Sequence, residues 1–340
     1  MLQGKTDDNT TNPIMFDYSI VIRTLGNTGE KYHTMLQAIA HQTVQPREVV
    51  VAIPKEYSLD FTLGYERVVH CKKGMVTQRA AGIGAARGEY LLVLDDDLDF
   101  PPDFAEKLYE VLKEKKLDCV LAFPTYGVES NDNPTSREHL SVKEIARKIR
   151  GAFTGQVFYS NKKSEWFDVI TGTAGHRTYV NCEDKLCQAG CFQCFFIKND
   201  KAKAVHLEDE VWLEQGRLSG YAAYDDAVFF YKFHLQGGRI AYSTNTDYSH
   251  LDAAAGRPAK NRLEAKRIRL YTIARNRTLF WLRLIWPSRR NLRTLLGGLY
   301  ALNNYTIYNI AINLYPKYWT AIAALFRGYN DAFSYYKRNK

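Results

Sequence analysis

The segment Ala86-Arg-Gly-Glu-Tyr-Leu-Leu-Val-Leu-Asp-Asp-Asp97 is the strongest indication of the fold class in this sequence. Its apolar run, 90–94, is followed at once by three carboxylates, which predicts a buried strand with charged groups at its carboxyl end. Carboxylates at such a place are costly to bury unless a cation or hydrogen-bond donors compensate them. Mg²⁺ or Mn²⁺, held by one or two carboxylates and completed by phosphate oxygens, is the simplest such cation. The alternative is an acidic surface turn before a helix.

Around this strand, apolar runs of strand type alternate with segments of helical periodicity. The predicted strands are 18–23, 48–53, 68–70, 90–94 and 119–123, and the predicted helices are 31–41, 77–87 and 102–116. This alternation predicts parallel strands joined by crossover helices, with ligands at the carboxyl ends of the strands. The expected fold class is therefore α/β, with a Rossmann-like, mostly parallel sheet flanked by helices.

The glycine-rich segment 82–88 invites comparison with a dinucleotide-binding fingerprint, but its context excludes that interpretation. The fingerprint needs glycines at its first, third and sixth positions, after a strand and at the start of a helix. Here the sixth position is Arg87, and the segment precedes a strand. We expect these glycines to allow close packing and then to cap the helix.

The order of these motifs resembles the inverting glycosyltransferases of family 2, which have the GT-A fold. The resemblance covers residues 18 to about 125 and depends on a succession of motifs. These are Ile22-Arg-Thr-Leu25, Leu36-Gln-Ala-Ile-Ala-His-Gln42, Gln45-Pro-Arg-Glu-Val49, Gln78-Arg79, Gly82-Ile83 and the 86–97 stretch. Further on, Arg275-Asn276-Arg277 is similar to a segment of rhamnosyltransferase-like and galactofuranosyltransferase-like members.

The resemblance implies that the chain binds a nucleotide-diphosphate sugar. It places Arg23 and Thr24 near the nucleotide, Arg79 near the base or pyrophosphate, and Asp95 and Asp96 near the ribose or donor sugar. A leaving diphosphate gains charge in the transition state, and a divalent cation and a guanidinium stabilise that charge.

The resemblance also implies a metal site, in which Asp97 would hold Mg²⁺ or Mn²⁺. His250 occupies a position where several family members complete the metal site with a histidine. A neutral imidazole is a sensible further ligand for Mn²⁺. A lone histidine is otherwise a plain surface or core residue.

On the acceptor side, Asp225 and Asp226 resemble the acidic pair that precedes a helix in this family. The resemblance implies that Asp226 is the base that takes the proton of the acceptor hydroxyl, with Asp225 in a supporting or swapped role. Asp is also favoured at a helix N-terminus for structural reasons. Trp212 and His176 are candidate contacts for the acceptor, although a core position is the alternative for any single aromatic residue.

The cysteines and the chain start indicate a cytoplasmic protein. Residues 1–16 are polar and lack the pattern of a signal peptide, so we expect a disordered start and a reducing compartment. Four of the six cysteines form a C-x4-C-x3-C-x2-C run whose spacing differs from the usual zinc and iron–sulfur motifs. We expect reduced thiols, with a metal site as the alternative, at Cys182, Cys187, Cys191 and Cys194.

The formal net charge of +9 is unevenly distributed along the chain. Residues 257–340 have 17 Lys or Arg and two acidic residues, a net of +15, whereas the first 256 residues have a net of −6. The basic region is also aromatic and has helical periodicity, and no run approaches the roughly 18 apolar residues that span a bilayer. We expect this C-terminal helical extension to lie on a membrane surface. Packing on the catalytic domain or a homo-oligomer contact is the alternative.

These observations divide the chain into a glycosyltransferase domain at 17–255, with a nucleotide-sugar half (17–125) and an acceptor half (126–255), and an amphipathic helical region at 256–340. The predicted function is metal-dependent inverting transfer to a glycan or polyprenyl-linked acceptor, at the inner face of the plasma membrane, in cell-surface polysaccharide or glycolipid synthesis. The alternatives are a catalytically silent GT-A binding module and a sugar nucleotidyltransferase. The uneven charge argues against nucleic-acid binding, since such proteins carry basic groups on the folded reading surface.

Overall fold

The computed structural model describes residues 15–125, 167–168, 173–174, 186, 190–218, 223–251 and 261–339. His176, Cys182 and Cys187 lie outside the described residues, as do residues 1–14 of the expected disordered start. At the first described residues, the ring of Phe16 stacks on Tyr109 with 4.2 Å between ring centroids.

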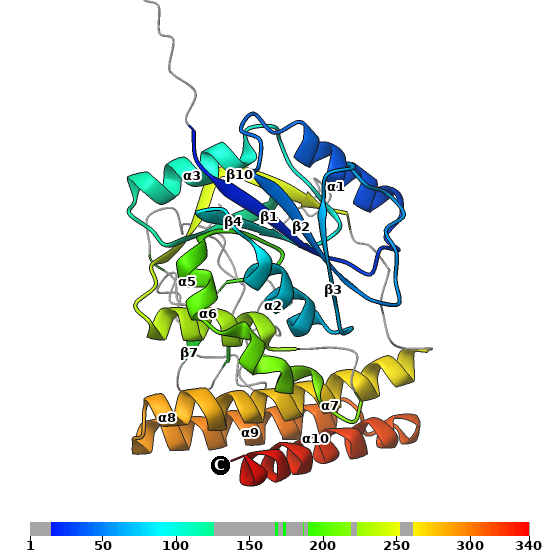
Figure 1. The fold of residues 1–340 in the computed structure, drawn as a ribbon. Coiled ribbons are helices and arrows are strands. Elements are labelled where there is room, and N and C mark those ends of the chain that lie inside the picture. Colours follow the sequence, from blue (N-terminus) through cyan, green and yellow to red (C-terminus); the bar gives the residue numbers. More distant parts are fainter. Residues whose placement is uncertain are drawn as a thin grey trace, which may run out of the picture.

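A central sheet of eight strands organises the chain, in the order β3-β2-β1-β4-β9-β6-β10-β5 (Figure 1). The strands are β1 (Tyr18–Arg23), β2 (Glu48–Pro54), β3 (Arg67–Cys71), β4 (Tyr90–Leu94), β5 (Leu98–Asp99), β6 (Cys119–Thr125), β9 (Cys194–Lys198) and β10 (Ile240–His250). The neighbours β3, β2, β1 and β4 pair in parallel, and so do β6 and β10. Strand β9 is antiparallel to both β4 and β6, and β5 is antiparallel to β10. The expected α/β fold with a mostly parallel sheet is confirmed.

Helices cover both faces of this sheet. On the upper face in Figure 1 lie α1 (Glu30–Ala40) and α3 (Phe104–Glu114). Below the sheet lie α2 (Met75–Ala85), α5 (Asn199–Ala204), the 3-10 helix η1 (Leu207–Glu214) and α6 (Asp225–Leu235). A separate two-stranded sheet pairs β7 (Phe167–Asp168) with β8 (Thr173–Ala174).

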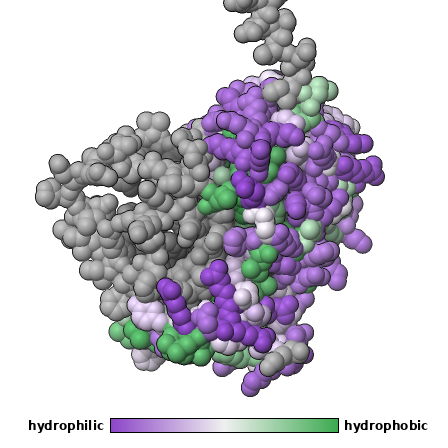
Figure 2. All heavy atoms as spheres, turned by 90° about the vertical axis from the view of Figure 1, so that its left-hand side faces the viewer, coloured by the Kyte–Doolittle hydropathy of each residue, from purple (hydrophilic) through white to green (hydrophobic). Residues whose placement is uncertain are grey.

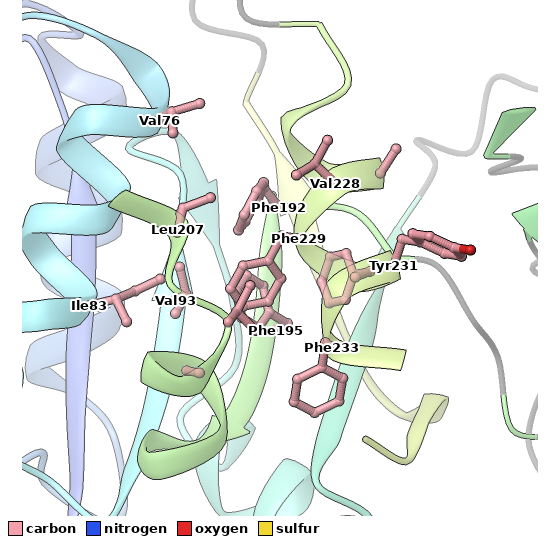
Figure 3. Packing of buried hydrophobic residues seen from close by; sticks show 14 of the residues in the cluster. Val76, Ile83, Val93, Phe192, Phe195, Leu207, Val228, Phe229, Tyr231 and Phe233 are labelled. Carbon is pink, nitrogen blue, oxygen red and sulfur yellow. The ribbon is translucent and has the colours of Figure 1, made fainter. Parts of the chain in front are cut away.

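Two hydrophobic cores result from the alternation of side chains along the strands. In β1, Val21 belongs to the lower core, whereas Ile20 and Ile22 belong to the upper one. The lower core is rich in phenylalanine, and Phe195 of β9 packs against Phe229 of α6 with 5.7 Å between ring centroids (Figure 3). This packing fixes α6, and with it the acidic pair at its N-terminus, below the sheet.

Gly88 allows the chain to pass close to β1 just before β4 begins. The helix α2 ends at Ala85 and not at Gly88, so the expected helix cap at this glycine is wrong. A Cβ on Gly88 would lie 2.5 Å from the backbone nitrogen of Ser19, which leaves room for glycine alone. The close approach lets the Gly88 N–H donate to Ser19 Oγ at 2.8 Å.

The expected C-terminal helical extension is present below the α/β domain (Figure 1). It consists of α7 (Arg262–Phe280), the π-helical turn η2 (Trp281–Ile285), α8 (Trp286–Ser288), α9 (Leu292–Ala311), the 3-10 turn η3 (Pro316–Tyr318) and α10 (Trp319–Arg338). Leu270 and Ala274 of α7 pack on Ala321 and Leu325 of α10 in a small core of their own. Within the described ranges, none of the helices is both long and apolar enough to span a membrane.

Candidate active site

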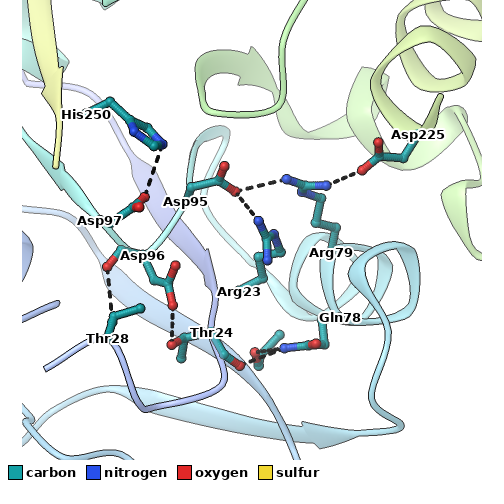
Figure 4. Close-up of polar contacts among 11 residues, drawn as sticks. Arg23, Thr24, Thr28, Gln78, Arg79, Asp95, Asp96, Asp97, Asp225 and His250 are labelled. Atoms are coloured by element: carbon teal, nitrogen blue, oxygen red, sulfur yellow. Dashed lines mark hydrogen bonds and ion pairs between the residues drawn. The ribbon is translucent and has the colours of Figure 1, made fainter. Parts of the chain in front are cut away.

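A chain of ion pairs crosses the carboxyl edge of the sheet (Figure 4). Asp95, directly after β4, lies with Oδ1 3.0 Å from a guanidinium nitrogen of Arg23 at the end of β1. The same oxygen lies 2.9 Å from Arg79 of α2, whose other terminal nitrogen pairs with Asp225. Burial acts to raise the pKa of Asp95, but the two guanidinium groups outweigh it and hold the pKa below its ordinary value. Side chains from β1, β4, α2 and α6 are thus joined.

Arg79 is the centre of this chain. Its side chain is only 4% exposed, and its guanidinium stacks over the ring of Phe192 at 4.3 Å from the centroid. Both terminal nitrogens are engaged by carboxylates, and these two carboxylates come from positions 130 residues apart in the sequence. Arg79 therefore acts in this structure as a tie that sets Asp95 and Asp225 relative to each other.

Asp96 points away from the ion-pair chain toward the loop after β1 (Figure 4). Its Oδ2 accepts a hydrogen bond of 2.6 Å from Thr24 Oγ1, which itself accepts from the Gly26 N–H at 2.8 Å. Burial raises the pKa of the Asp96 carboxyl to about 6, although Arg23 and the Thr24 hydrogen bond oppose the shift. Gln78 of α2 secures the same loop by donating to the Thr24 carbonyl at 2.7 Å.

Asp97 and His250 face each other at the far end of the site (Figure 4). Antiparallel pairing of β10 with β5 sets His250 opposite Leu98, and the Leu251 N–H donates to the Asp97 carbonyl at 2.8 Å. His250 Nε2 then lies 3.4 Å from Asp97 Oδ1. Among the residues that the structure describes, no three His, Cys, Asp or Glu side chains gather into a metal cluster. The two groups supply one carboxylate oxygen and one imidazole nitrogen, which are donor types that Mn²⁺ accepts.

The acidic pair at the start of α6 divides into two different environments. Asp225 is 7% exposed and bound to Arg79. Burial raises the pKa of Asp225, with the Arg79 charge opposing that shift. Asp226 is half-buried, and its Oδ1 accepts from the Ala227 N–H at 2.7 Å. Both residues lie in the first turn of the helix, where the free amides and the helix dipole favour Asp, and the N-cap residue Tyr224 has no side-chain cap hydrogen bond. The more accessible carboxylate is therefore Asp226.

Trp212 does not lie on an accessible surface. The side chain is 1% exposed within the lower core, its Nε1 donates to Glu210, and Arg283 stacks over its ring. An acceptor sugar cannot contact an indole in this position, so the expectation that Trp212 binds acceptor is wrong for this conformation. The competing interpretation, a core aromatic, agrees with the structure.

The two described members of the cysteine run are free thiols beside this site. Cys194 is buried in β9, and Cys191 lies in the preceding turn. Burial raises the pKa of Cys191 to about 12, and it raises that of Cys194 as well. Both thiols are therefore protonated at neutral pH.

Glu214 stabilises the helix that carries two of the site residues, although no sequence motif around Glu214 indicates this role. It lies at the end of η1, and its carboxylate accepts from the N–H groups of Val76 and Thr77 and from Thr77 Oγ1, the last two at 3.0 and 2.8 Å. These are otherwise unpaired amides at the N-terminus of α2, where the helix dipole favours an anion. Because α2 carries Gln78 and Arg79, Glu214 holds the helix that positions both.

We expect Glu214→Ala to lower the free energy of unfolding by about 1–2 kcal/mol, because it removes the cap of α2. Urea unfolding at pH 7 measures this change. Glu208→Ala is the matched control, since Glu208 lies on the same 3-10 helix but pairs only with His206 at the surface. Equal stability of the two variants would contradict the capping role.

A parallel sheet with charged side chains gathered at the carboxyl ends of β1 and β4 is the arrangement of a nucleotide-binding α/β enzyme. The particular class follows from the sequence comparison. Residues 30–183 match the family model "Glycosyl transferase family 2". This part of the chain, which includes Asp95, Asp96 and Asp97, matches a family 2 glycosyltransferase domain, and the match supports a glycosyltransferase activity. The resemblance inferred from the sequence is confirmed.

Solved structures provide distant likenesses. S. aureus TarS 1–349 is 15% identical, with 95% of this chain and 92% of that chain covered and a TM-score of 0.41. The mannosyltransferase PcManGT from Pyrobaculum calidifontis, in complex with GDP-Man and Mn²⁺, is 11% identical, with 94% and 90% covered and a TM-score of 0.46. No curated protein matches the chain.

Proposed function

We propose that the protein is a metal-dependent inverting glycosyltransferase that moves a sugar from a nucleotide-diphosphate donor to a hydroxyl of a glycan or polyprenyl-linked acceptor. The observation that supports this most strongly is the ion-pair chain Arg23–Asp95–Arg79–Asp225. It connects the end of the sheet that holds Asp97 and His250 to the helix that begins with the acidic pair (Figure 4). A donor site and a proton acceptor are thereby held in one rigid arrangement.

The donor diphosphate is proposed to bind beside Arg23. The Arg23 side chain is more exposed than that of Arg79, 21% against 4%. Its Nε is buried and has no hydrogen-bond partner among the described residues. A phosphate oxygen is the acceptor that such a group lacks, and Arg is well suited to diphosphate recognition. Thr24, Asp95 and Asp96 surround the same place and are proposed contacts of the nucleoside and donor sugar.

Asp97 and His250 are proposed to hold Mn²⁺ or Mg²⁺, since their donor atoms fit such an ion. The bound cation would stabilise the negative charge that the diphosphate gains as it leaves. Two protein ligands suffice for a cation that shares its coordination with phosphate oxygens. The 3.4 Å separation of Asp97 Oδ1 and His250 Nε2 supports a cation shared by the two groups.

Asp226 is proposed as the general base. In an inverting transfer, the acceptor oxygen bonds to the anomeric carbon as the bond to the diphosphate breaks, and the hydroxyl proton passes to a carboxylate. Asp226 is the accessible member of the pair, whereas Asp225 is engaged by Arg79. Asp225 therefore takes the supporting role, in which it orients the start of α6.

We expect Asp97→Asn to weaken Mn²⁺ binding by about tenfold or more, since even outer-shell changes weaken metal affinity by about 10–100-fold. Electron paramagnetic resonance titration of Mn²⁺ in the presence of UDP, GDP or dTDP measures this affinity. Asp99→Asn is the matched control, because Asp99 is an exposed carboxylate two residues away. Unchanged Mn²⁺ affinity in Asp97→Asn would contradict the proposed metal site.

The C-terminal extension is proposed to bind an anionic membrane surface. Of the 16 large hydrophobic side chains exposed among the described residues, 11 lie between Leu292 and Phe333, in α9, α10 and the turn between them. Apolar side chains gather beside hydrophilic ones at the lower edge of the molecule in Figure 2, where these helices lie. A second copy would bring the same +15 charge of region 257–340, whereas anionic lipid offers the complementary charge. We therefore place the enzyme at the cytosolic face of the plasma membrane, where it would reach polyprenyl-linked acceptors.

We expect the triple variant Leu292→Ser, Leu296→Ser, Leu299→Ser to bind vesicles with 30% phosphatidylglycerol at least about tenfold more weakly than the wild type, because each exposed leucine supplies about 1.5–3 kcal/mol when buried. Co-sedimentation with these vesicles, and with pure phosphatidylcholine, measures binding. Val68→Ser, at an exposed site on β3, is the control. The membrane assignment would be contradicted if the wild type did not bind vesicles but formed a concentration-dependent dimer that only the triple variant abolished.

A further inference from the structure

The segment that leads into α6 is tied to α7 at both of its ends. The side-chain amide of Asn276 donates one hydrogen bond to the Leu213 carbonyl at 2.9 Å and a second to the Ala223 carbonyl at 3.0 Å. Arg275 adds a third tie by donating to the Trp212 carbonyl at 2.8 Å. One amide group therefore bridges the end of η1 and the start of α6.

The hydrogen bonds of the Asn276 side chain are buried, and each of its polar atoms has a partner. Asn276 is 0% exposed and Arg275 is 3% exposed. Both amide protons of Asn276 are used, and its Oδ1 accepts from Arg275 at 2.7 Å. Loss of the amide would leave two buried carbonyls unpaired, and an unsatisfied buried polar group costs more than an ordinary hydrogen bond contributes. The buried hydrogen bonds of Asn276 therefore hold the Leu213 and Ala223 carbonyls in fixed positions.

The geometry that it holds is a strained one. Tyr224, next to Ala223, has φ 79°, in the left-handed region that a bulky residue seldom occupies. Such a conformation persists only when its surroundings enforce it. Asn276 fixes the carbonyl on one side of Tyr224, and the Val228 N–H donates to the Tyr224 carbonyl at 2.9 Å on the other. The next two residues are Asp225 and Asp226.

The middle of the segment is held by the extension as well. The Tyr271 hydroxyl accepts from the Arg217 N–H at 2.8 Å and donates to Asp331 of α10 at 2.8 Å. Arg217 Nε also lies 3.3 Å from Asp331. The C-terminal helices thus contact the segment before the acidic pair at several points, and none of these residues belongs to the donor site.

We propose that Asn276 is a positioning residue that sets the place of Asp226 through the Ala223 carbonyl. The C-terminal extension is then a required part of the acceptor side of the active site. This inference rests on the proposed function, in which Asp226 is the base. Asn276 acts through the backbone and does not itself touch the reacting atoms.

Hydrogen exchange followed by mass spectrometry on the ligand-free protein tests the tie without any assumption about substrate. We expect the amides of residues 213–218 and 223–226 to exchange at least tenfold faster in Asn276→Ala, while β1 and β4 keep their rates. Asn309→Ala is the matched control, because Asn309 is also buried and donates only within its own helix. Tyr271→Phe removes one hydroxyl and provides a milder second variant if Asn276→Ala does not fold. Unchanged exchange in the variants that fold would overturn the proposal.

Steady-state transfer kinetics supply the second readout. Asn276→Ala is expected to lower kcat at least tenfold with the donor KM within twofold of the wild type, because donor contacts stay in place. An unchanged kcat despite faster exchange would overturn the positioning role. Absence of transfer by the wild type with every donor would overturn the proposed function, and the exchange data would still decide whether Asn276 holds the segment.

Discussion

Asp226→Asn is expected to lower the rate of sugar transfer by about 10²–10⁴-fold, which is the range of a general base contribution. The substitution keeps the shape of the side chain and an oxygen that accepts from the Ala227 N–H, so α6 should begin as before. Binding of nucleotide diphosphate should not change, because Arg23 and Asp95 are untouched. Single-turnover transfer and calorimetric binding of the nucleotide measure the two quantities separately.

Asp209→Asn, at an exposed carboxylate on η1, is the control for this experiment. Asp225→Asn should behave differently from Asp226→Asn, since it breaks the ion pair with Arg79 and should lower stability as well as rate. A variant Asp226→Asn that transfers sugar at a rate near that of the wild type would contradict the assignment of the base. If only Asp225→Asn lost activity, and its stability were unchanged, Asp225 would be the base and Asp226 the supporting residue.

Arg79→Met is expected to lower the free energy of unfolding by about 3–5 kcal/mol, because it leaves two buried carboxylates without their shared cation. Asp225 loses this ion-pair partner, and Asp95 keeps only its pair with Arg23. Urea unfolding at pH 7 measures this loss. Arg47→Met is the matched control, since Arg47 pairs with Asp17 at 2.7 Å but both side chains are largely exposed, and such pairs contribute about 1 kcal/mol or less.

The pH dependence of this variant has a definite sign. The pKa of Asp95 is held below its ordinary value in the folded protein, so its ionised form stabilises the fold above that ordinary value. This stabilisation disappears as pH falls through the folded pKa. In Arg79→Met the pKa should rise, and the acid-sensitive part of the stability should shrink. A loss in Arg79→Met no larger than that in Arg47→Met, at any pH, would contradict the central role of the ion-pair chain.

The first half of the fold is predictable because its information is local. The apolar runs of β1, β2 and β4 and the periodicity of α1 and α3 each specify an element, and the alternation of the two specifies a parallel sheet. Strand β9 was not predicted, although its run Cys194–Lys198 is apolar. It enters the sheet between β4 and β6 by antiparallel pairing, with Phe196 opposite both Leu92 and Val120. Nothing within the run itself encodes those distant partners.

The site also combines features that local sequence predicts with features that depend on long-range contacts. Asp95, Asp96 and Asp97 follow a strand, so their place at the carboxyl edge could be predicted from the sequence. The contact of Arg79 with Asp225 and the cap that Glu214 provides for α2 join residues more than 130 positions apart, and only the folded chain brings them together. For Trp212 the sequence did not distinguish two possibilities, because an aromatic side chain can stack on a sugar or pack in a hydrophobic core equally well.

The proposed activity of this site is the transfer of sugar from a nucleotide-diphosphate donor with the help of a divalent cation. The most direct test incubates the full chain with a panel of nucleotide sugars and a lipid extract, with Mn²⁺ or with chelator, and follows products by mass spectrometry. With Mn²⁺ only, we expect one donor to yield free nucleoside diphosphate and a lipid product heavier by one sugar residue. Product formation that is equal with Mn²⁺ and with chelator, or no transfer from any donor, would contradict the proposed activity.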